Sequence, residues 1–145
     1  MNIAIGSDHA GVELKEQIKT FLASKSIEVL DVGPHDEISV DYPDYAKLVT
    51  DHVCKDKNTL GILICGTGIG MSIAANKVNG IRAALVTSVE MAEMTKRHNN
   101  ANVLCLSARM IDPEVNLAMV KTWLETDFEG DRHQRRIDKI HALEQ

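Results

Sequence analysis

Short apolar runs of strand length alternate with helical patterns along the whole chain, and this alternation restricts the fold more than any other feature. The five runs are Asn2–Gly6, Ile27–Val32, Leu60–Ile64, Ile81–Val86 and Asn102–Ser107. Strands that alternate with helices form parallel βαβ units, and nearly continuous apolar strands indicate a sheet that is covered on both faces. We therefore expect an α/β fold, a three-layer sandwich with a five-stranded, parallel, Rossmann-like sheet flanked by helices.

The segments between these runs carry helical signals. Apolar residues near helical spacing predict a helix over 12–23, and Pro43 suits the first turn of a second helix that continues to Val53. Further helices are predicted for Met71–Lys77, from the cap Ser88, from the pair Asp112–Pro113, and from near Gly130 to the C-terminus as an extra terminal helix. No linker or repeat interrupts the pattern, so we expect residues 1–145 to form one domain.

Composition argues against several classes of function. A net charge of −5 and an aromatic content of 3% favour neither a nucleic-acid partner nor an anionic membrane. Three cysteines without Cys-x-x-Cys spacing argue against a disulfide framework and a structural zinc site. No apolar run is long enough to cross a bilayer, and Met1 leads directly into a predicted strand. We therefore expect a cytoplasmic protein with no membrane partner.

The third apolar run ends at Cys65, which is followed by the glycine-rich segment Gly66–Gly70 and a predicted helix. A turn of this kind directs backbone N–H groups toward one point, where they would bind an anion and favour a thiolate at Cys65. The dinucleotide fingerprint is incomplete because Met71 stands where its third glycine should be, and there is no P-loop sequence. The alternative interpretation is a tight turn beside a buried, inert cysteine.

Polar residues also occur next to other predicted elements. Asp8 and His9 follow the first strand, where ligands bind in folds of this class. The alternative for this pair is a helix N-cap beside a surface histidine. Tyr42 would either pack or offer its hydroxyl to a ligand. His98 suits acid–base chemistry at neutral pH, whereas the nearby Asn100 suits a helix C-cap.

The C-terminal region concentrates arginines in an otherwise acidic chain. Arg132 and Arg136 are four residues apart and would share one helix face. Guanidinium groups bind phosphate in a bidentate manner, so this pair is a candidate anion site. The alternative is a solvated helix face on which the arginines pair with Asp131 and Asp138.

Together these clusters resemble the ribose-5-phosphate isomerase B family, within the wider group that includes galactose-6-phosphate isomerase subunits. The matching segments run in order along the chain: Gly6–His9, Asp41–Pro43, Ile64–Gly70, Ser72–Lys77, Gly80–Ala83, His98–Asn99 and Gly130–Arg136. The resemblance implies interconversion of D-ribose 5-phosphate and D-ribulose 5-phosphate in the pentose phosphate pathway, without metal or cofactor. It also implies a homodimer or a dimer of dimers.

The resemblance further implies roles for individual residues. Cys65 corresponds to the proton-abstracting base, where other members carry Glu; His98 corresponds to the acid that opens the furanose ring, and Thr67 to a third catalytic residue in the anion-hole loop. The substrate-binding positions are Asp8, His9, Tyr42, Gly66, Gly68, Ile69, Gly70, Asn99, Arg109, Arg132 and Arg136, of which the three arginines correspond to phosphate ligands. The resemblance places His98, Asn99 and Arg109 on the neighbour of the subunit that supplies Cys65.

The chemistry of such a reaction suits the residues, because isomerisation needs a base beside a carbonyl and stabilisation of the resulting enediolate. Two alternatives stay open. One is a six-carbon sugar-phosphate isomerase for allose 6-phosphate or galactose 6-phosphate. The other is a non-catalytic sugar-phosphate- or nucleotide-binding module, which would bind without proton exchange. Ser7 and Arg135 depart slightly from the family pattern and leave the sugar preference open.

Overall fold

The computed structural model describes residues 1–145 and contains a five-stranded sheet in which every neighbouring pair is parallel. The strands are β1 (Asn2–Ser7), β2 (Glu28–Asp31), β3 (Thr59–Cys65), β4 (Ala83–Leu85) and β5 (Val103–Ser107). Their order across the sheet is β2-β1-β3-β5-β4. The predicted α/β fold with a parallel five-stranded sheet is confirmed.

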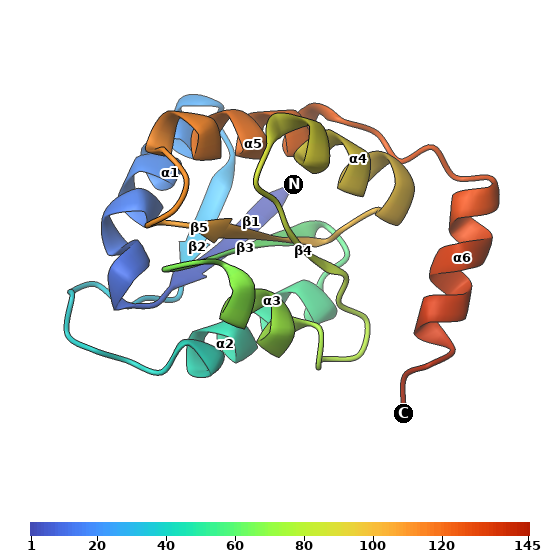
Figure 1. Ribbon diagram of the computed structural model, residues 1–145, viewed down its shortest axis with the longest axis horizontal. Helices are drawn as coiled ribbons and strands as arrows, with labels where there is room; N and C mark the ends of the chain where they lie inside the picture. Colours follow the sequence, from blue (N-terminus) through green and yellow to red (C-terminus); the bar gives the residue numbers. More distant parts are fainter.

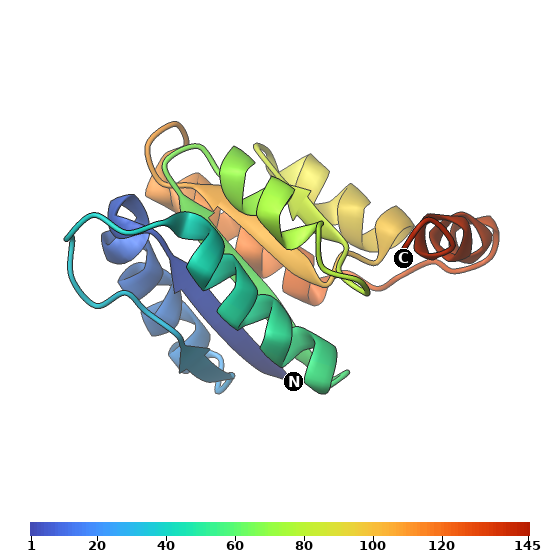
Figure 2. The ribbon, with the colours of Figure 1, turned by 90° about the horizontal axis from the view of Figure 1, so that it is seen from below.

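Helices cover both faces of the sheet and make the three layers visible in Figure 1. On one face lie α1 (Val12–Ser24), α4 (Val89–Asn99) and α5 (Pro113–Glu125), and on the other lie α2 (Tyr42–Lys55) and α3 (Ile69–Ala75). The short 3-10 helix η1 (His9–Gly11) precedes α1. The last helix, α6 (Arg132–His141), stands at the periphery beyond α4 (Figures 1 and 2). No helix is both long and apolar enough to cross a membrane.

Alternation of side chains along the strands divides the core in two. In β3, Ile62 and Ile64 belong to the cluster packed against α1 and α5, whereas Leu63 and Cys65 belong to the cluster packed against α2 and α3. All four are at most 5% exposed, as a sheet covered on both faces requires. The alternation therefore determines that the Cys65 side chain points to the α2 and α3 layer.

A buried ion pair holds the segment that leads from β2 toward α2. Lys15 of α1 is fully buried, and its Nζ donates to Asp31 Oδ1 at 2.7 Å and to the carbonyl of Pro34. Asp31 Oδ1 also accepts from the Gly33 N–H at 2.8 Å. The buried ammonium thus has charged and polar partners, as burial of a charge requires.

Some local expectations differ from the structure. The strand predicted over 81–86 is limited to β4, because the Arg82 N–H donates to the Asn102 side-chain oxygen at 2.8 Å instead of joining the ladder. The terminal helix ends at His141, short of the C-terminus. Ser88 caps α4 through its hydroxyl as predicted, whereas Asp112 precedes α5 without a side-chain cap hydrogen bond.

The strand order creates a switch point between β1 and β3. The chain moves from β1 to β2 on one side and then returns to place β3 on the other side of β1. Connections that leave neighbouring strands in opposite directions open a crevice at the carboxyl ends, where ligands bind in this class of fold. The segments after β1 and β3 meet at this crevice.

Candidate active site

An open pocket of about 470 Å³ lies at the carboxyl ends of the strands. Its lining residues are Asp8, Tyr42, Cys65, Gly66, Thr67, Ile69, Gly70, Ile73 and Arg109. All except Ile73 are site residues predicted from the sequence. Ile73 lies one turn after Ile69 on α3, which is the helical spacing that could have identified it.

The sulfur of Cys65 lies at the end of β3 and accepts a hydrogen bond from the backbone N–H of Gly68 at 3.1 Å. The donor is in place because the chain turns back immediately after the strand. Gly68 makes this turn with a φ of +80°, a conformation that favours glycine. Thr67 lies at the tip of the loop, where its hydroxyl oxygen accepts from the Ile69 N–H at 3.2 Å. The loop therefore gives the sulfur one backbone donor, the Gly68 N–H.

The segment after β5 holds this loop in place. The Ser107 hydroxyl donates to the carbonyl of Gly66 at 2.7 Å, and the Arg109 N–H donates to the same carbonyl at 3.0 Å. Ser107 is opposite Cys65 in the sheet register and is 1% exposed. Its anchoring role was not predicted, because a serine at the end of an apolar strand carries no specific sequence signal.

Arg109 lies beside Cys65 within one chain, whereas the resemblance implied that it comes from the neighbouring subunit. Its side chain lies against Gly66, so close that a Cβ at Gly66 would be 3.2 Å from Nη1. Within the chain, Arg109 therefore lines the same pocket as Cys65. The reason is topological, since β5 is adjacent to β3 and the carboxyl ends of parallel strands meet at one edge.

Residues from the β1 end and the start of α2 complete the rim. Asp8 is 8% exposed and its carboxylate accepts from the amide two residues later at 2.9 Å, so it caps η1 and still lines the pocket. His9 Nδ1 accepts from the Val40 N–H at 3.3 Å, which ties the long segment before α2 to this edge. The Tyr42 ring packs on the backbone of Gly70, where a Cβ would be 2.6 Å from the ring.

The remaining predicted residues lie elsewhere in the chain. His98 and Asn99 are at the end of α4, which runs back from the carboxyl edge toward the start of β5. Asn100 follows in the left-handed conformation with a φ of 44° and serves as the C-cap. Arg132 and Arg136 are exposed on α6 and form no ion pair within the chain, so the alternative pairing with neighbouring aspartates does not occur.

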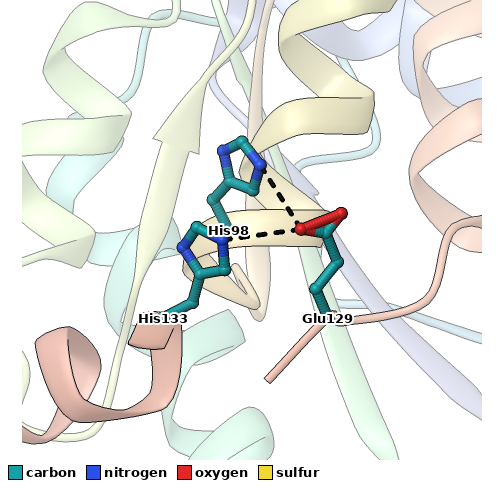
Figure 3. Close-up of side chains that lie close together, drawn as sticks. All are labelled: His98, Glu129 and His133. Atoms are coloured by element: carbon teal, nitrogen blue, oxygen red, sulfur yellow. Dashed lines mark ion pairs between the residues drawn. The ribbon is translucent and has the colours of Figure 1, made fainter. Parts of the chain in front are cut away.

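His98 belongs to a second cluster that joins α4 to α6 (Figure 3). The rings of His98 and His133 are stacked, with centroids 4.3 Å apart and planes at 11°. Glu129 Oε1 faces both rings, at 3.7 Å from His98 Nε2 and 3.5 Å from His133 Nε2. Neither Glu129 nor His133 was predicted as a site residue; their spacing of four residues is a weak signal, since His98 is far away in sequence.

The geometry of this cluster favours a stacked histidine pair facing a carboxylate over a set of metal ligands. The three ligand atoms lie within 4.8 Å of one another. However, two nearly parallel stacked rings cannot both direct an in-plane lone pair at one ion between them, and zinc requires convergent donors. Partial burial alone would raise the pKa of Glu129, but the hydrogen bond and charge of Arg97 lower it. Burial and the charge of Arg132 lower the pKa of His133.

A larger cavity of about 570 Å³ lies at the opposite edge of the sheet, near the amino ends of β3 and β5. It is lined by Cys54, Lys57, Lys96 and neighbouring polar residues, and by none of the predicted site residues. The Arg82 guanidinium in its wall already donates to the carbonyl oxygens of Asn99 and Asn100. Size alone therefore does not identify the site, and the residues predicted from the sequence gather at the smaller pocket.

Comparison with known proteins identifies the family. The model of the family described as Ribose/Galactose Isomerase matches residues 3–140. The chain belongs to this family. Its ribose/galactose isomerase relatives include the ribose-5-phosphate isomerase B of Escherichia coli strain K12, which is 43% identical over 143 residues, covering 99% of this chain and 96% of the relative.

Solved structures of ribose/galactose isomerase relatives have the same fold. The ribose-5-phosphate isomerase B of Clostridium thermocellum superimposes with a TM-score of 0.97 at 48% identity, covering 99% of this chain and 97% of the other. The ribose-5-phosphate isomerase B of Mycoplasma genitalium, solved with bound ribulose-5-phosphate, gives a TM-score of 0.94 at 51% identity, covering 97% and 94%.

Proposed function

We propose that this chain is an aldose–ketose isomerase that interconverts D-ribose 5-phosphate and D-ribulose 5-phosphate through an enediolate. Membership of the family supports the reaction class, and ribulose-5-phosphate bound to the Mycoplasma genitalium relative supports the substrate. The observation that carries the proposal is the Cys65 sulfur, which lies in the pocket at the switch point and accepts a hydrogen bond from the Gly68 N–H.

In the proposed reaction, the Cys65 thiolate removes the proton from the carbon next to the carbonyl. The negative charge that develops on the substrate oxygens is stabilised by the N–H groups of the loop that contains Thr67. Asp8, His9 and Tyr42 contact the sugar, and Arg109 contributes positive charge on the opposite wall. This stabilisation of the transition state is large because the N–H donors are in place before the reaction and need no reorganisation.

The site is proposed to be shared between two copies of the chain. His98, Asn99, Arg132 and Arg136 do not line the pocket of their own chain, so a second copy is needed to supply the ring-opening acid and the phosphate ligands. The peripheral α6 has an apolar surface available for such pairing, since Ile140 is 47% exposed. A two-fold dimer would form two equivalent sites of this kind.

The experiment that tests the proposed function is exchange of substrate protons in deuterated water. With the unsubstituted protein, ribose 5-phosphate should incorporate deuterium at C2 during isomerisation. Cys65→Ala should abolish this deuterium uptake while it preserves binding of the sugar phosphate. Cys54→Ala is the matched control, because Cys54 is an exposed thiol outside the pocket. Uptake near the normal rate in Cys65→Ala would exclude Cys65 as the base.

The shared site is tested by mixing two inactive chains. Cys65→Ala and His98→Ala chains are unfolded and refolded together, so that random pairing gives about half mixed dimers, each with one intact site. About a quarter of normal activity should return. If no activity returns although mass spectrometry shows mixed dimers, both residues act within one chain.

The choice between five-carbon and six-carbon sugars is tested with the same assay. Ribose 5-phosphate, allose 6-phosphate and galactose 6-phosphate are compared by kcat/KM. We expect ribose 5-phosphate to be preferred, and a higher value for a hexose phosphate would change the substrate assignment while leaving the role of Cys65 intact. Binding of all three without exchange would instead indicate a non-catalytic module.

A further inference from the structure

The Glu129 carboxylate is held in a defined orientation. Its backbone N–H donates to the carbonyl of Arg97 at 3.1 Å, which attaches the segment between α5 and α6 to the end of α4. The Arg97 guanidinium then donates through Nε to Glu129 Oε2 at 2.9 Å and through Nη1 to Glu93 Oε1 at 2.9 Å. One oxygen of Glu129 is therefore occupied by Arg97, and the other is free to face the two histidines (Figure 3).

The His133 ring restricts the plane of His98. The two rings are 11° from parallel, and stacking on a buried neighbour limits rotation of His98 about its side-chain bonds. The His133 side chain is 7% exposed, and its Nε2 has no hydrogen-bond partner within bonding distance. The nearest acceptor to that nitrogen is Glu129 Oε1 at 3.5 Å, so the polar edge of the stack is directed at one carboxylate oxygen.

The charges around the stack bear mainly on His133. The charged groups that act on its ring are Glu129, which is paired with Arg97 of α4, and Arg132 and Arg136 on α6, whereas Glu93 contacts only Arg97. Burial and Arg132 lower the pKa of His133, which keeps this ring neutral near neutral pH. The single carboxylate oxygen is then available to His98, which is the more exposed ring at 38%.

We propose that Glu129 and His133 are positioning residues for His98: the carboxylate orients the Nε2 edge of the ring, and the stacked His133 ring fixes its plane for proton transfer to the sugar ring oxygen. This inference rests on the proposed function, in which His98 opens the furanose ring. It adds two residues that do not touch the substrate but determine the direction in which the acid points. A third group that orients the acid or base is a recurrent feature of catalytic sites.

The test separates ring opening from proton abstraction. Ribulose 5-phosphate cannot close into a furanose because its O5 carries the phosphate, so exchange of its C1 protons with deuterated water needs the base but not ring opening. Isomerisation of ribose 5-phosphate needs both. Glu129→Gln should lower kcat for ribose 5-phosphate by about tenfold or more, a part of the roughly 10²–10⁴-fold contribution of a general acid. The rate of C1 exchange in ribulose 5-phosphate should stay within about twofold of normal. A defect in folding would instead lower the rates of both reactions.

Three variants complete the design. Glu93→Gln is the matched control, because it removes the other carboxylate on Arg97 without facing the histidines, and it should leave both reactions nearly unchanged. His133→Phe, which retains a stacked ring, should retain more ribose 5-phosphate activity than His133→Ala. Equal loss of both reactions in Glu129→Gln, or equal effects of Glu129→Gln and Glu93→Gln, would overturn the positioning role. Absence of both reactions in the unsubstituted protein would instead refute the proposed function.

Discussion

The contact between Gly70 and Tyr42 predicts that Gly70→Ala changes the free energy of unfolding in opposite directions with and without the Tyr42 ring. A Cβ at position 70 would lie 2.6 Å from two ring carbons of Tyr42 and 3.0 Å from its hydroxyl oxygen. Overlap of this kind costs about 1–3 kcal/mol when the neighbours cannot move. In the opposite direction, Ala in a helix is more favourable than Gly by up to about 1 kcal/mol. Gly70→Ala alone should therefore lower the free energy of unfolding by up to about 2 kcal/mol.

In a Tyr42→Ala background the overlap is gone, and Gly70→Ala should raise the free energy of unfolding by up to about 1 kcal/mol. The coupling between the two positions is then about 1–3 kcal/mol, which urea unfolding of the four proteins at one protein concentration can measure. The KM for ribose 5-phosphate should also rise in Gly70→Ala, because the displaced ring no longer forms the rim of the pocket. The reasoning fails if Gly70→Ala has the same effect in both backgrounds to within about 0.5 kcal/mol.

Three other outcomes are expected. Arg136→Ala should weaken binding of ribose 5-phosphate by roughly 1.5–3 kcal/mol but not binding of ribose, whereas Arg135→Ala should change neither; equal losses for both sugars would indicate a structural role. Burial alone would raise the pKa of Asp31, but the hydrogen bonds from Lys15, Lys19 and the Gly33 N–H together lower it. This carboxylate therefore adds stability above the unfolded pKa of about 3.9 and loses it as the pH falls through the folded pKa. Asp31→Asn should cost about 3–5 kcal/mol at pH 7 in urea unfolding, because it leaves the ammonium without its counter-charge, and the cost should shrink progressively as the pH falls below about 3.9. Gly68→Ala should destabilise by at least about 1 kcal/mol, since its φ is +80°, and should lower kcat by disturbing the donor to the Cys65 sulfur; full activity with normal stability would contradict this.

The sheet and its layers were predictable because the signals for them are local. Ile62 to Ile64 are apolar on both faces, which already indicates a covered strand, and the alternation with helices indicates parallel pairing. The shortening of β4 was not predictable, because it depends on the side-chain amide of Asn102 taking the N–H of Arg82. Such a contact is determined by the packed structure and not by the pattern of the strand itself.

The pocket was partly predictable for the same reason, since Cys65 ends one strand and Asp8 follows another whose carboxyl end lies beside it, whereas Arg109 was implied only by the family resemblance. The cluster around His98 was not. It requires a particular path between α5 and α6, in which Asp131 adopts a φ of 50° and Glu129 comes back to α4. No periodicity in the sequence indicates the course of this segment. Two of the three members of the cluster, Glu129 and His133, were therefore missed.

The peripheral attachment of α6 has a consequence for motion. β3 lies between β1 and β5 at the centre of the sheet, so its amides should exchange hydrogen only when the whole domain opens, whereas α6 packs mainly against α4 and can detach within one chain by local opening. The proposed base would then lie on the slowest-exchanging segment and the proposed phosphate ligands on a faster one.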